Sequence, residues 1–340
     1  MKRGIWIVSE GSPGHVSQSV GLAEALAATE PVTIERLECR PRLNGFARRL
    51  VQRWMGGKGR PLPGWLLSRA GLDAAALPAG KPDLILSSGG KSVFAARTLA
   101  VRYGAPYVFL GERKPYPSAW FHTAFTPSKF ETGENDVSID MIPTLVTRAR
   151  VEQAASEWPE RPEGKLWAAL IGGSSASHRY TPEDWRALAR AMNSVAHREG
   201  IRWLVTTSRR TGAEVETCLR QTLDPAVVAE AVWWAERPEK KMNRYLGAAE
   251  RLLVTQDSVT MVSEAIDSGR PVIVVRPRDT RFSPESFLPG YFDRLERTGR
   301  MQRALMTDLS DWPATLALPE NAPTAADEIA IALKSRLGWD

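Results

Sequence analysis

The first histidine of the chain stands in a short glycine-rich turn, Gly11-Ser-Pro-Gly-His15. An apolar run precedes this turn and a helical pattern follows it, so His15 is expected where a buried strand passes into a helix. An imidazole titrates near neutral pH and can remove a proton from an attacking hydroxyl. We therefore predict that His15 is a general base, with Glu10 as the second candidate. A His15 that only caps the helix or orients a substrate is the alternative.

Three strand ends in the second half of the chain also carry residues suited to binding. They follow apolar runs that end at Ile171, Val205 and Thr255. The residues at these corners that we assign to the binding of a donor are Gly172, Gly173, Ser174, Ser175, Ser208, Arg209, Arg210, Gln256, Asp257, Ser258 and Val259.

These corners have the chemistry of a phosphate site. Glycine lets a backbone come close to a phosphate, and the amide groups at the start of a helix attract negative charge. The predicted diphosphate cradle consists of Gly173, Ser174, Ser258 and Val259. Arg209 or Arg210 would add a charge-assisted hydrogen bond. Each glycine corner could instead be only a tight turn, but three corners on one predicted sheet edge favour an anion site.

Other residues complete the predicted site. Glu264 lies six residues after Ser258 on the same predicted helix, where its carboxylate can accept hydrogen bonds from both ribose hydroxyls; a solvent-facing acid is the alternative. Trp234 ends a predicted strand and either shelters a base or belongs to the core. Acceptor contacts are assigned to Gly14, Gly90 and Lys91. No residues have metal-ligand spacing, so we expect arginines and helix ends to act without a metal.

The elements that position these residues alternate between strand and helix patterns. The predicted strands are 5–8, 32–37, 84–87, 107–110 and 123–125, then 166–171, 203–206, 231–234, 252–255 and 272–275. Such alternation is typical of an α/β fold with parallel sheets, and ligands bind at the carboxyl ends of the strands in doubly wound folds. We therefore expect two Rossmann-like, doubly wound domains that face one interdomain cleft.

The domain boundary is predicted near residue 160, because prolines and polar residues between 141 and 164 resemble a linker with one short helix. This gives an acceptor domain at 1–160, a nucleotide-sugar domain at 161–320 and a C-terminal helix within 321–340 that packs back near the cleft. Thr181 is the predicted N-cap of the first helix of the second domain. Its core residues recur at helical spacing and are Trp185, Leu188, Met192 and Val195.

The composition is that of a soluble globular protein. Of 340 residues, 43% are hydrophobic and 25% charged, and the net charge is +6. Cys39 and Cys218 lie far apart, which makes a disulfide framework or a zinc site unexpected. No secretory leader is recognised and no apolar run reaches the ~18 residues that a membrane-spanning helix needs. These features predict a cytoplasmic protein.

The basic residues are concentrated between Arg40 and Arg69. This window holds eight Lys and Arg residues and no acid, and apolar residues are interleaved with them. Such a segment, the basic excursion at 40–70, suits the surface of an anionic bilayer, which would place the protein peripherally on the inner face of the cytoplasmic membrane. It could equally pack its apolar face on its own domain. Nucleic acid is not expected as a partner, because no recognition motif accompanies the charge.

Two sets of residues resemble known families. Gly11-x-x-Gly14-His15 with Leu22-Ala-Glu-Ala-Leu26 resembles the N-terminal loop of the GT-B glycosyltransferase that adds N-acetylglucosamine to lipid-linked muramyl pentapeptide. A resemblance over most of the chain is to bacterial relatives of the plant mitochondrial-fission "elongated mitochondria" family. The residues that carry it are Gly172-Gly-Ser, Thr206-Thr-Ser-Arg-Arg210, Val254-Thr-Gln-Asp-Ser258, Ser263-Glu-Ala265 and Gly269-x-Pro271.

These resemblances imply a GT-B fold with the nucleotide-sugar donor on the C-terminal lobe and the acceptor on the N-terminal lobe. By position, His15 would be the base or an acceptor contact and Glu264 the ribose ligand. Ser258 and Val259 would contact phosphate, and Ser263 belongs to the same helix motif. The His-x-x-Gln-x-x-Asn-Ala stretch of the lipid-linked enzyme is missing, and 276–285 stands in its place. Recognition of that enzyme's donor sugar is therefore not carried over.

The sequence thus predicts an inverting, metal-independent glycosyltransferase that uses a nucleotide-diphosphate sugar and needs no cofactor. Its acceptor would be a lipid-linked or cell-envelope glycan. A nucleotide-sugar epimerase of the same fold and a non-catalytic adaptor at a membrane are the alternatives.

Overall fold

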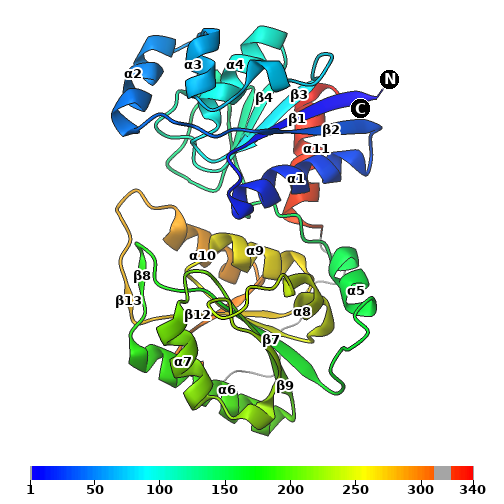
Figure 1. Ribbon diagram of the computed structural model, residues 1–340, viewed down its shortest axis with the longest axis vertical. Helices are drawn as coiled ribbons and strands as arrows, with labels where there is room; N and C mark the ends of the chain where they lie inside the picture. Colours follow the sequence, from blue (N-terminus) through cyan, green and yellow to red (C-terminus); the bar gives the residue numbers. More distant parts are fainter. Residues whose placement is uncertain (1, 310–322, 340) are drawn as a thin grey trace. The chain divides into compact units, whose positions relative to one another are not determined.

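The computed structural model describes residues 2–309 and 323–339, which form two compact units (Figure 1). The first unit runs up to Leu145 and resumes at Pro323, and the second begins at Val146. The division lies earlier than the boundary predicted near residue 160. Residues 1, 310–322 and 340 of the predicted domain ranges lie outside the described residues.

The first unit is built on a parallel sheet with six described strands in the order β2-β1-β3-β4-β5-β6. These strands are β1 (Arg3–Ser9), β2 (Val32–Glu38), β3 (Leu84–Ser88), β4 (Tyr107–Leu110), β5 (Thr123–Thr126) and β6 (Asp136–Ser138). The five strands predicted in this half are confirmed. The short, partly exposed and polar β6 was not predicted, since it has too few apolar residues to show a strand pattern.

Helices cover both faces of this sheet (Figure 1). They are α1 (Pro13–Ala27), α2 (Gly45–Met55), α3 (Gly64–Arg69), α4 (Val93–Tyr103) and α11 (Ala325–Leu337). The C-terminal helix α11 packs against α1, and Lys334 Nζ lies 3.2 Å from Glu30 Oε1. The predicted C-terminal helix therefore belongs to the first unit.

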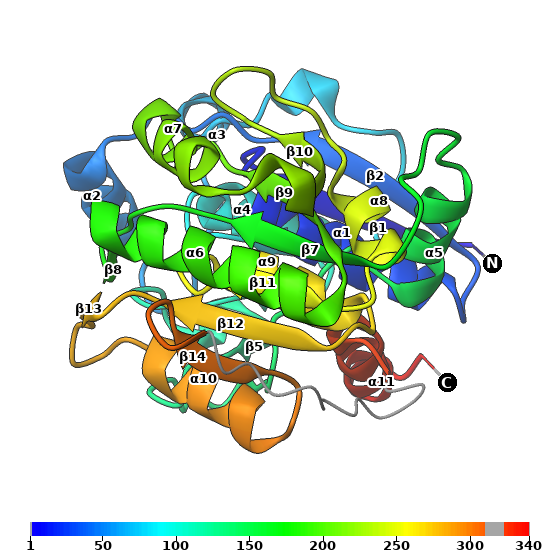
Figure 2. The same cartoon turned by 90° about the horizontal axis from the view of Figure 1, so that it is seen from below.

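The second unit repeats the architecture, with six described parallel strands in the order β10-β9-β7-β11-β12-β14 (Figure 2). They are β7 (Leu166–Ile171), β9 (Arg202–Thr207), β10 (Val228–Val232), β11 (Leu252–Thr255), β12 (Val272–Arg276) and β14 (Gln302–Leu305). A separate ribbon pairs β8 (His178–Arg179) with β13 (Asp279–Thr280). The prediction of strand 231–234 was partly wrong: β10 ends at Val232, so Trp234 lies in the turn that follows it.

Helices again lie on both faces of the sheet, with α8, α9 and α10 on one and α6 and α7 on the other (Figure 1). The helices of this unit are α5 (Arg148–Ser156), α6 (Pro182–Glu199), α7 (Ala213–Thr222), α8 (Met242–Ala248), α9 (Val259–Asp267) and α10 (Leu288–Arg297). Thr181 is the N-cap of α6, as predicted, and it forms a capping box with Asp184. The four predicted core residues of α6 are all buried.

The segment predicted as a linker is structured, because α5 packs tightly on α8. A Cβ added to Gly247 would lie 1.9 Å from the carbonyl oxygen of Val151, so only glycine permits this approach. This packing makes α5 part of the second unit.

The strand orders identify one preferred ligand position in each unit. Ligands of doubly wound sheets bind beyond the carboxyl ends of the strands where the order reverses. In the first unit this switch point lies between β1 and β3, and in the second between β7 and β11. No helix within 2–309 and 323–339 combines the length and apolarity needed to cross a bilayer.

Candidate functional site

His15 and Glu10 form a hydrogen-bonded pair at the switch point of the first unit. His15 Nδ1 lies 2.6 Å from Glu10 Oε1. Glu10 follows β1, and His15 lies in the first turn of α1. The His15 side chain is 38% exposed and the Glu10 side chain only 9%. The carboxylate is therefore sheltered behind an imidazole that a substrate can reach.

This arrangement places the two ring nitrogens in different surroundings. Burial by itself raises the pKa of Glu10, but the hydrogen bond and charge of His15 and the charge of Lys91 outweigh it, so that the pKa is lowered. In the neutral tautomer that carries its proton on Nδ1, the ring donates to an ionised Glu10 and keeps the lone pair on Nε2. Glu10, predicted as a second base, is therefore a hydrogen-bond partner of His15. Its Oε2 atom is buried and has no hydrogen-bond partner among the described residues.

Gly89, at the end of β3, makes room for this pair. Its φ is +80°, and a Cβ at this position would lie 2.3 Å from His15 Nδ1 and 2.7 Å from Glu10 Oε1. Both the backbone conformation and the space therefore require glycine. The Ser-Gly-Gly sequence at 88–90 was the available signal for this close approach.

The predicted acceptor residues lie near the same pair. Gly14 precedes His15 within α1. The Gly90 carbonyl accepts hydrogen bonds from Arg48 Nη2 at 2.6 Å and from the Tyr116 hydroxyl at 2.7 Å. Lys91 is exposed. The structure thus brings together Glu10, His15 and the loop after β3, while Arg48 and Tyr116 were not predicted for this region.

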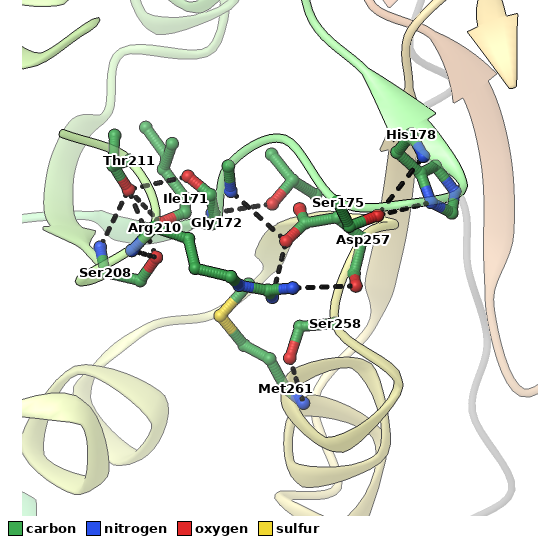
Figure 3. A network of polar contacts seen from close by, with 12 residues as sticks. Ile171, Gly172, Ser175, His178, Ser208, Arg210, Thr211, Asp257, Ser258 and Met261 are labelled. Carbon is green, nitrogen blue, oxygen red and sulfur yellow. Dashed lines mark hydrogen bonds and ion pairs between the residues drawn. The ribbon is translucent and has the colours of Figure 1, made fainter. Parts of the chain in front are cut away.

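Asp257 is the centre of the predicted donor region in the second unit (Figure 3). Its side chain is fully buried. The carboxylate accepts hydrogen bonds from Arg210 Nη2 at 2.6 Å, from the Gly173 amide at 3.1 Å and from the Tyr180 hydroxyl at 3.1 Å. Burial raises its pKa despite the nearby Arg210 charge. Asp257 therefore ties the loops after β7, β9 and β11 together at the switch point.

The two glycines of this region serve that packing. A Cβ on Gly172 would lie 2.3 Å from the Asp257 carboxylate, and one on Gly173 would lie 2.1 Å from the Arg210 carbonyl. The Thr211 hydroxyl adds a link, donating to the Gly172 carbonyl at 2.6 Å and accepting from the Ser208 amide at 2.9 Å (Figure 3). The glycines are thus required where three loops approach each other.

The two arginines that the sequence left as alternatives are both exposed. Arg210 is ion-paired to the buried Asp257 carboxylate. Ser174 is also exposed, and its hydroxyl accepts the Tyr180 amide. Ser175 accepts the His178 amide through its hydroxyl at 3.2 Å.

His178 is a buried histidine beside this loop. Its Nδ1 lies 2.9 Å from the Ser177 hydroxyl, and its Nε2 has no partner among the described residues. Burial, together with the charges of Arg210 and Arg276, lowers its pKa to about 4. His178 is therefore neutral at physiological pH.

The start of α9 is the other predicted phosphate contact. The Ser258 hydroxyl caps the helix by accepting the Met261 amide (Figure 3), and the first turn, from Val259, presents amides that have no carbonyl partner within the helix. Glu264 lies on α9 and is half-buried. Ser263 is buried, and its hydroxyl bonds the Val259 carbonyl and the Tyr291 hydroxyl. Its side chain therefore supports the packing of α9 on α10.

Two further residues flank this region. The half-buried Trp234 donates its backbone amide to Thr207 Oγ1 at 2.8 Å. Gln256 is buried and lines a cavity of about 400 Å³ with Arg276, Thr280 and Phe282. Its Oε1 atom has no partner among the described residues. Within the described part of the chain, no group of three His, Cys, Asp or Glu side chains is placed to hold a metal ion.

The sequence model of the mitochondrial fission ELM1 family matches residues 13–333. The chain belongs to this family. The resemblance to the "elongated mitochondria" proteins is thereby confirmed. No curated protein sequence matches significantly.

Solved structures show that this family member has a GT-B-like fold. UDP-GlcNAc 2-epimerase from Methanocaldococcus jannaschii superposes with a TM-score of 0.56 at 13% identity, over 98% of this chain and 100% of that one. The ADP-heptose LPS heptosyltransferase II of E. coli gives 0.52 at 13% identity, over 100% and 99%. UDP-GlcNAc 2-epimerase from Neisseria meningitidis bound to UDP-GlcNAc gives 0.50 at 12% identity, over 98% and 100%. At such identities the likeness shows the fold alone.

Proposed function

We propose that the protein is a glycosyltransferase that moves a sugar from a nucleoside-diphosphate donor to a hydroxyl of a lipid-linked or cell-envelope glycan. The observation that carries this proposal is the pair of His15 and Glu10 at the switch point of the first unit. An exposed imidazole whose Nδ1 is held by a buried carboxylate is arranged as a general base.

In the proposed reaction, His15 Nε2 removes the proton from the acceptor hydroxyl as its oxygen attacks the anomeric carbon of the donor sugar. The new glycosidic C–O bond forms while the bond from that carbon to the diphosphate oxygen breaks. The electron pair leaves with the nucleoside diphosphate, and His15 becomes an imidazolium that the Glu10 carboxylate stabilises. A single displacement of this kind inverts the anomeric configuration.

The second unit supplies the donor site in this proposal. The leaving diphosphate is placed at the start of α9 and beside the loop after β7, where the helix amides offset its charge. Glu264 would bind the ribose and Trp234 would shelter the base. The structural neighbours named for UDP-GlcNAc and ADP-heptose chemistry support this donor class.

The central experiment compares His15→Ala with the wild-type protein. A thermal-shift screen with UDP, ADP, GDP and dTDP first identifies the nucleotide, because a ligand at a hundredfold excess over its Kd stabilises by ~2.7 kcal/mol. The corresponding sugar nucleotides then serve as donors. We expect His15→Ala to abolish transfer while calorimetry shows an unchanged nucleotide affinity. Full transfer by this variant would overturn the assignment of His15.

Epimerisation of the nucleotide sugar is the second candidate. The burial of Glu10 and Asp257 favours it, because an epimerase needs sheltered acids and no acceptor. Incubation of the protein with the sugar nucleotide alone distinguishes the two reactions. Appearance of an isomerised sugar would identify the epimerase, and unchanged donor with acceptor-dependent release of nucleoside diphosphate would identify the transferase.

A further inference from the structure

The outer face of α2 carries an apolar stripe that its own unit leaves uncovered. Phe46, Leu50 and Trp54 stand four residues apart, so their side chains follow one line along the helix. They are 72%, 53% and 48% exposed, respectively. The opposite face packs on the unit through Val51 and Met55, which are buried. The helix is therefore apolar on two faces.

This pattern is unlike that of an ordinary surface helix, whose solvent side is polar. Contiguous exposed apolar side chains mark interaction sites. A further exposed tryptophan, Trp65, lies on α3 of the same excursion and is 68% exposed. The sequence left open whether the excursion packs on its own domain or meets a membrane. The structure shows that only part of its apolar surface is used for packing.

The charges beside the stripe have one sign. Arg49 and Arg53 lie next to it on α2 and are exposed. The excursion from Arg40 to Arg69 contains no acidic residue. The cations of this excursion that are exposed are Arg40, Arg42, Arg49, Arg53, Lys58, Arg60 and Arg69. This charge is complementary to a surface that is densely anionic.

We propose that α2 docks on an anionic lipid bilayer, with Phe46, Leu50 and Trp54 inserted at the boundary between headgroups and acyl chains. Arg49 and Arg53 then lie at the level of the lipid phosphates. A bilayer satisfies both properties of the surface, because it offers apolar depth below a layer of negative charge. Tryptophan is also favoured at this boundary.

The inner face of α2 holds the helix in this presentation. Arg48 Nη2 donates to the Gly90 carbonyl at 2.6 Å and to the Tyr116 hydroxyl at 2.6 Å. The Gln52 side chain donates to the Pro115 carbonyl at 2.7 Å. The stripe is therefore fixed on the unit before any lipid is present. Because Gly90 belongs to the loop beside His15, docking would also bring that loop to the membrane surface.

The test measures binding of the full chain to lipid vesicles by co-sedimentation. One set of vesicles contains phosphatidylcholine alone, and the other contains phosphatidylcholine mixed with phosphatidylglycerol. We expect binding to the anionic vesicles only, weakened at about 1 M salt, where the Debye length is about 3 Å. No substrate is present, so the result is independent of the proposed transferase activity.

Two sets of variants separate the apolar and the charged contributions. We expect Phe46→Ser with Trp54→Ser to lower vesicle affinity by about tenfold or more. The matched control is Phe130→Ser with Ile331→Ser, two exposed apolar residues elsewhere on the unit, and its affinity should not change. We expect Arg49→Gln and Arg53→Gln to lower affinity by about fivefold each, whereas Arg36→Gln and Arg102→Gln have little effect.

Melting temperatures equal to that of the wild type would show that the variants are folded. Equal binding to neutral and anionic vesicles would overturn the proposal. It would also be overturned if the control variants lost as much vesicle affinity as the α2 variants. Absence of vesicle binding, together with a self-association that Phe46→Ser with Trp54→Ser abolishes, would instead assign the stripe to a second copy of the chain. A loss of vesicle affinity in the α2 variants, but not in the control variants, would confirm the docking surface.

Discussion

The Nδ1 atom of His15 lies 2.6 Å from Oε1 of Glu10, five residues earlier in the chain. The turn at 11–14 brings the two side chains together beyond the end of β1. Gly89, directly after the neighbouring strand β3, leaves the space that an added Cβ would fill against both side chains. One buried carboxylate, one exposed imidazole and one glycine thus form a compact cluster at the switch point of the first unit.

Glu10→Gln should slow transfer while donor binding remains unchanged. The substituted amide would keep the size of the side chain but lose the charge that holds the Nδ1 proton and stabilises the imidazolium. We expect kcat to fall by about 10²-fold or more, within the range of general base catalysis. Steady-state kinetics and calorimetry with the nucleoside diphosphate measure the two effects. An unchanged kcat would show that Glu10 does not act through His15.

The same substitution has an effect on stability with a defined sign. The pKa of Glu10 is lowered below the ordinary 4.5 by His15, although burial opposes this. A depressed carboxyl pKa stabilises the folded protein above the unfolded pKa, and this contribution is lost as the pH falls through the folded value. Melting temperatures of the wild type and Glu10→Gln should therefore converge below about pH 4.5.

Gly89→Ala should displace the imidazole of His15, the proposed general base, without unfolding the first unit. The added Cβ would overlap the His15 ring, and the positive φ would strain the backbone by about 1 kcal/mol. The control is Gly104→Ala, because Gly104 also has a positive φ but has no atom within 4 Å of an added Cβ. Both variants should lose some stability, and only Gly89→Ala should lose most of its activity. Equal activity of the two variants would contradict the close approach to His15.

Arg210→Gln should destabilise the donor region, whereas Arg209→Gln should not. The first substitution removes the partner of the buried Asp257 carboxylate, and an uncompensated buried charge costs up to about 3–5 kcal/mol. The exposure of Arg210 and the other hydrogen bonds to Asp257 place the expected loss below that range. Melting temperatures and nucleotide affinity of both variants check this difference. An equal fall in melting temperature for Arg210→Gln and Arg209→Gln would show that the ion pair between Arg210 and Asp257 has no structural role.

His178 should make the second unit sensitive to acid. Its pKa is lowered to about 4 by burial and by Arg210 and Arg276, against the ordinary 6.5. The unfolded chain therefore takes up the proton at a higher pH than the folded chain, and stability falls as the pH drops from 6.5 towards 4, by about 3 kcal/mol. His178→Gln should remove this part of the pH dependence, measured by calorimetry. His197→Gln, at an exposed histidine, is the control.

Transfer should proceed in the presence of a metal chelator. In the proposed reaction, the amides at the start of α9 and the arginines of the second unit offset the charge of the leaving diphosphate. We expect EDTA to leave kcat unchanged within a factor of about two, since the proposed transition state is stabilised by amides and arginines alone. A loss of activity that added Mg²⁺ restores would require a different means of stabilising the diphosphate.

Local sequence patterns determined most elements of the fold. The strands of both sheets that consist of buried apolar runs were predicted, as was a C-terminal helix within 321–340, which is α11, because burial and helical periodicity are properties of neighbouring residues. The strands β6 and β14 were missed, since one has three residues and the other is only half-buried. The unit boundary was displaced because α5 joins the second unit through a contact with Gly247, which is distant in the sequence.

The sequence by itself also determined which corners are candidates for chemistry, because small, hydroxyl-bearing and ionisable residues directly follow apolar strands. Only the tertiary structure decided which partners each of these residues contacts. It paired Glu10 with His15 and Arg210 with Asp257, and turned Phe46, Leu50 and Trp54 outward. These outcomes depend on distances between segments that the order of residues in the chain does not fix. The packing of the elements decides which carboxylate pairs with which cation. It also decides which face of a helix is buried.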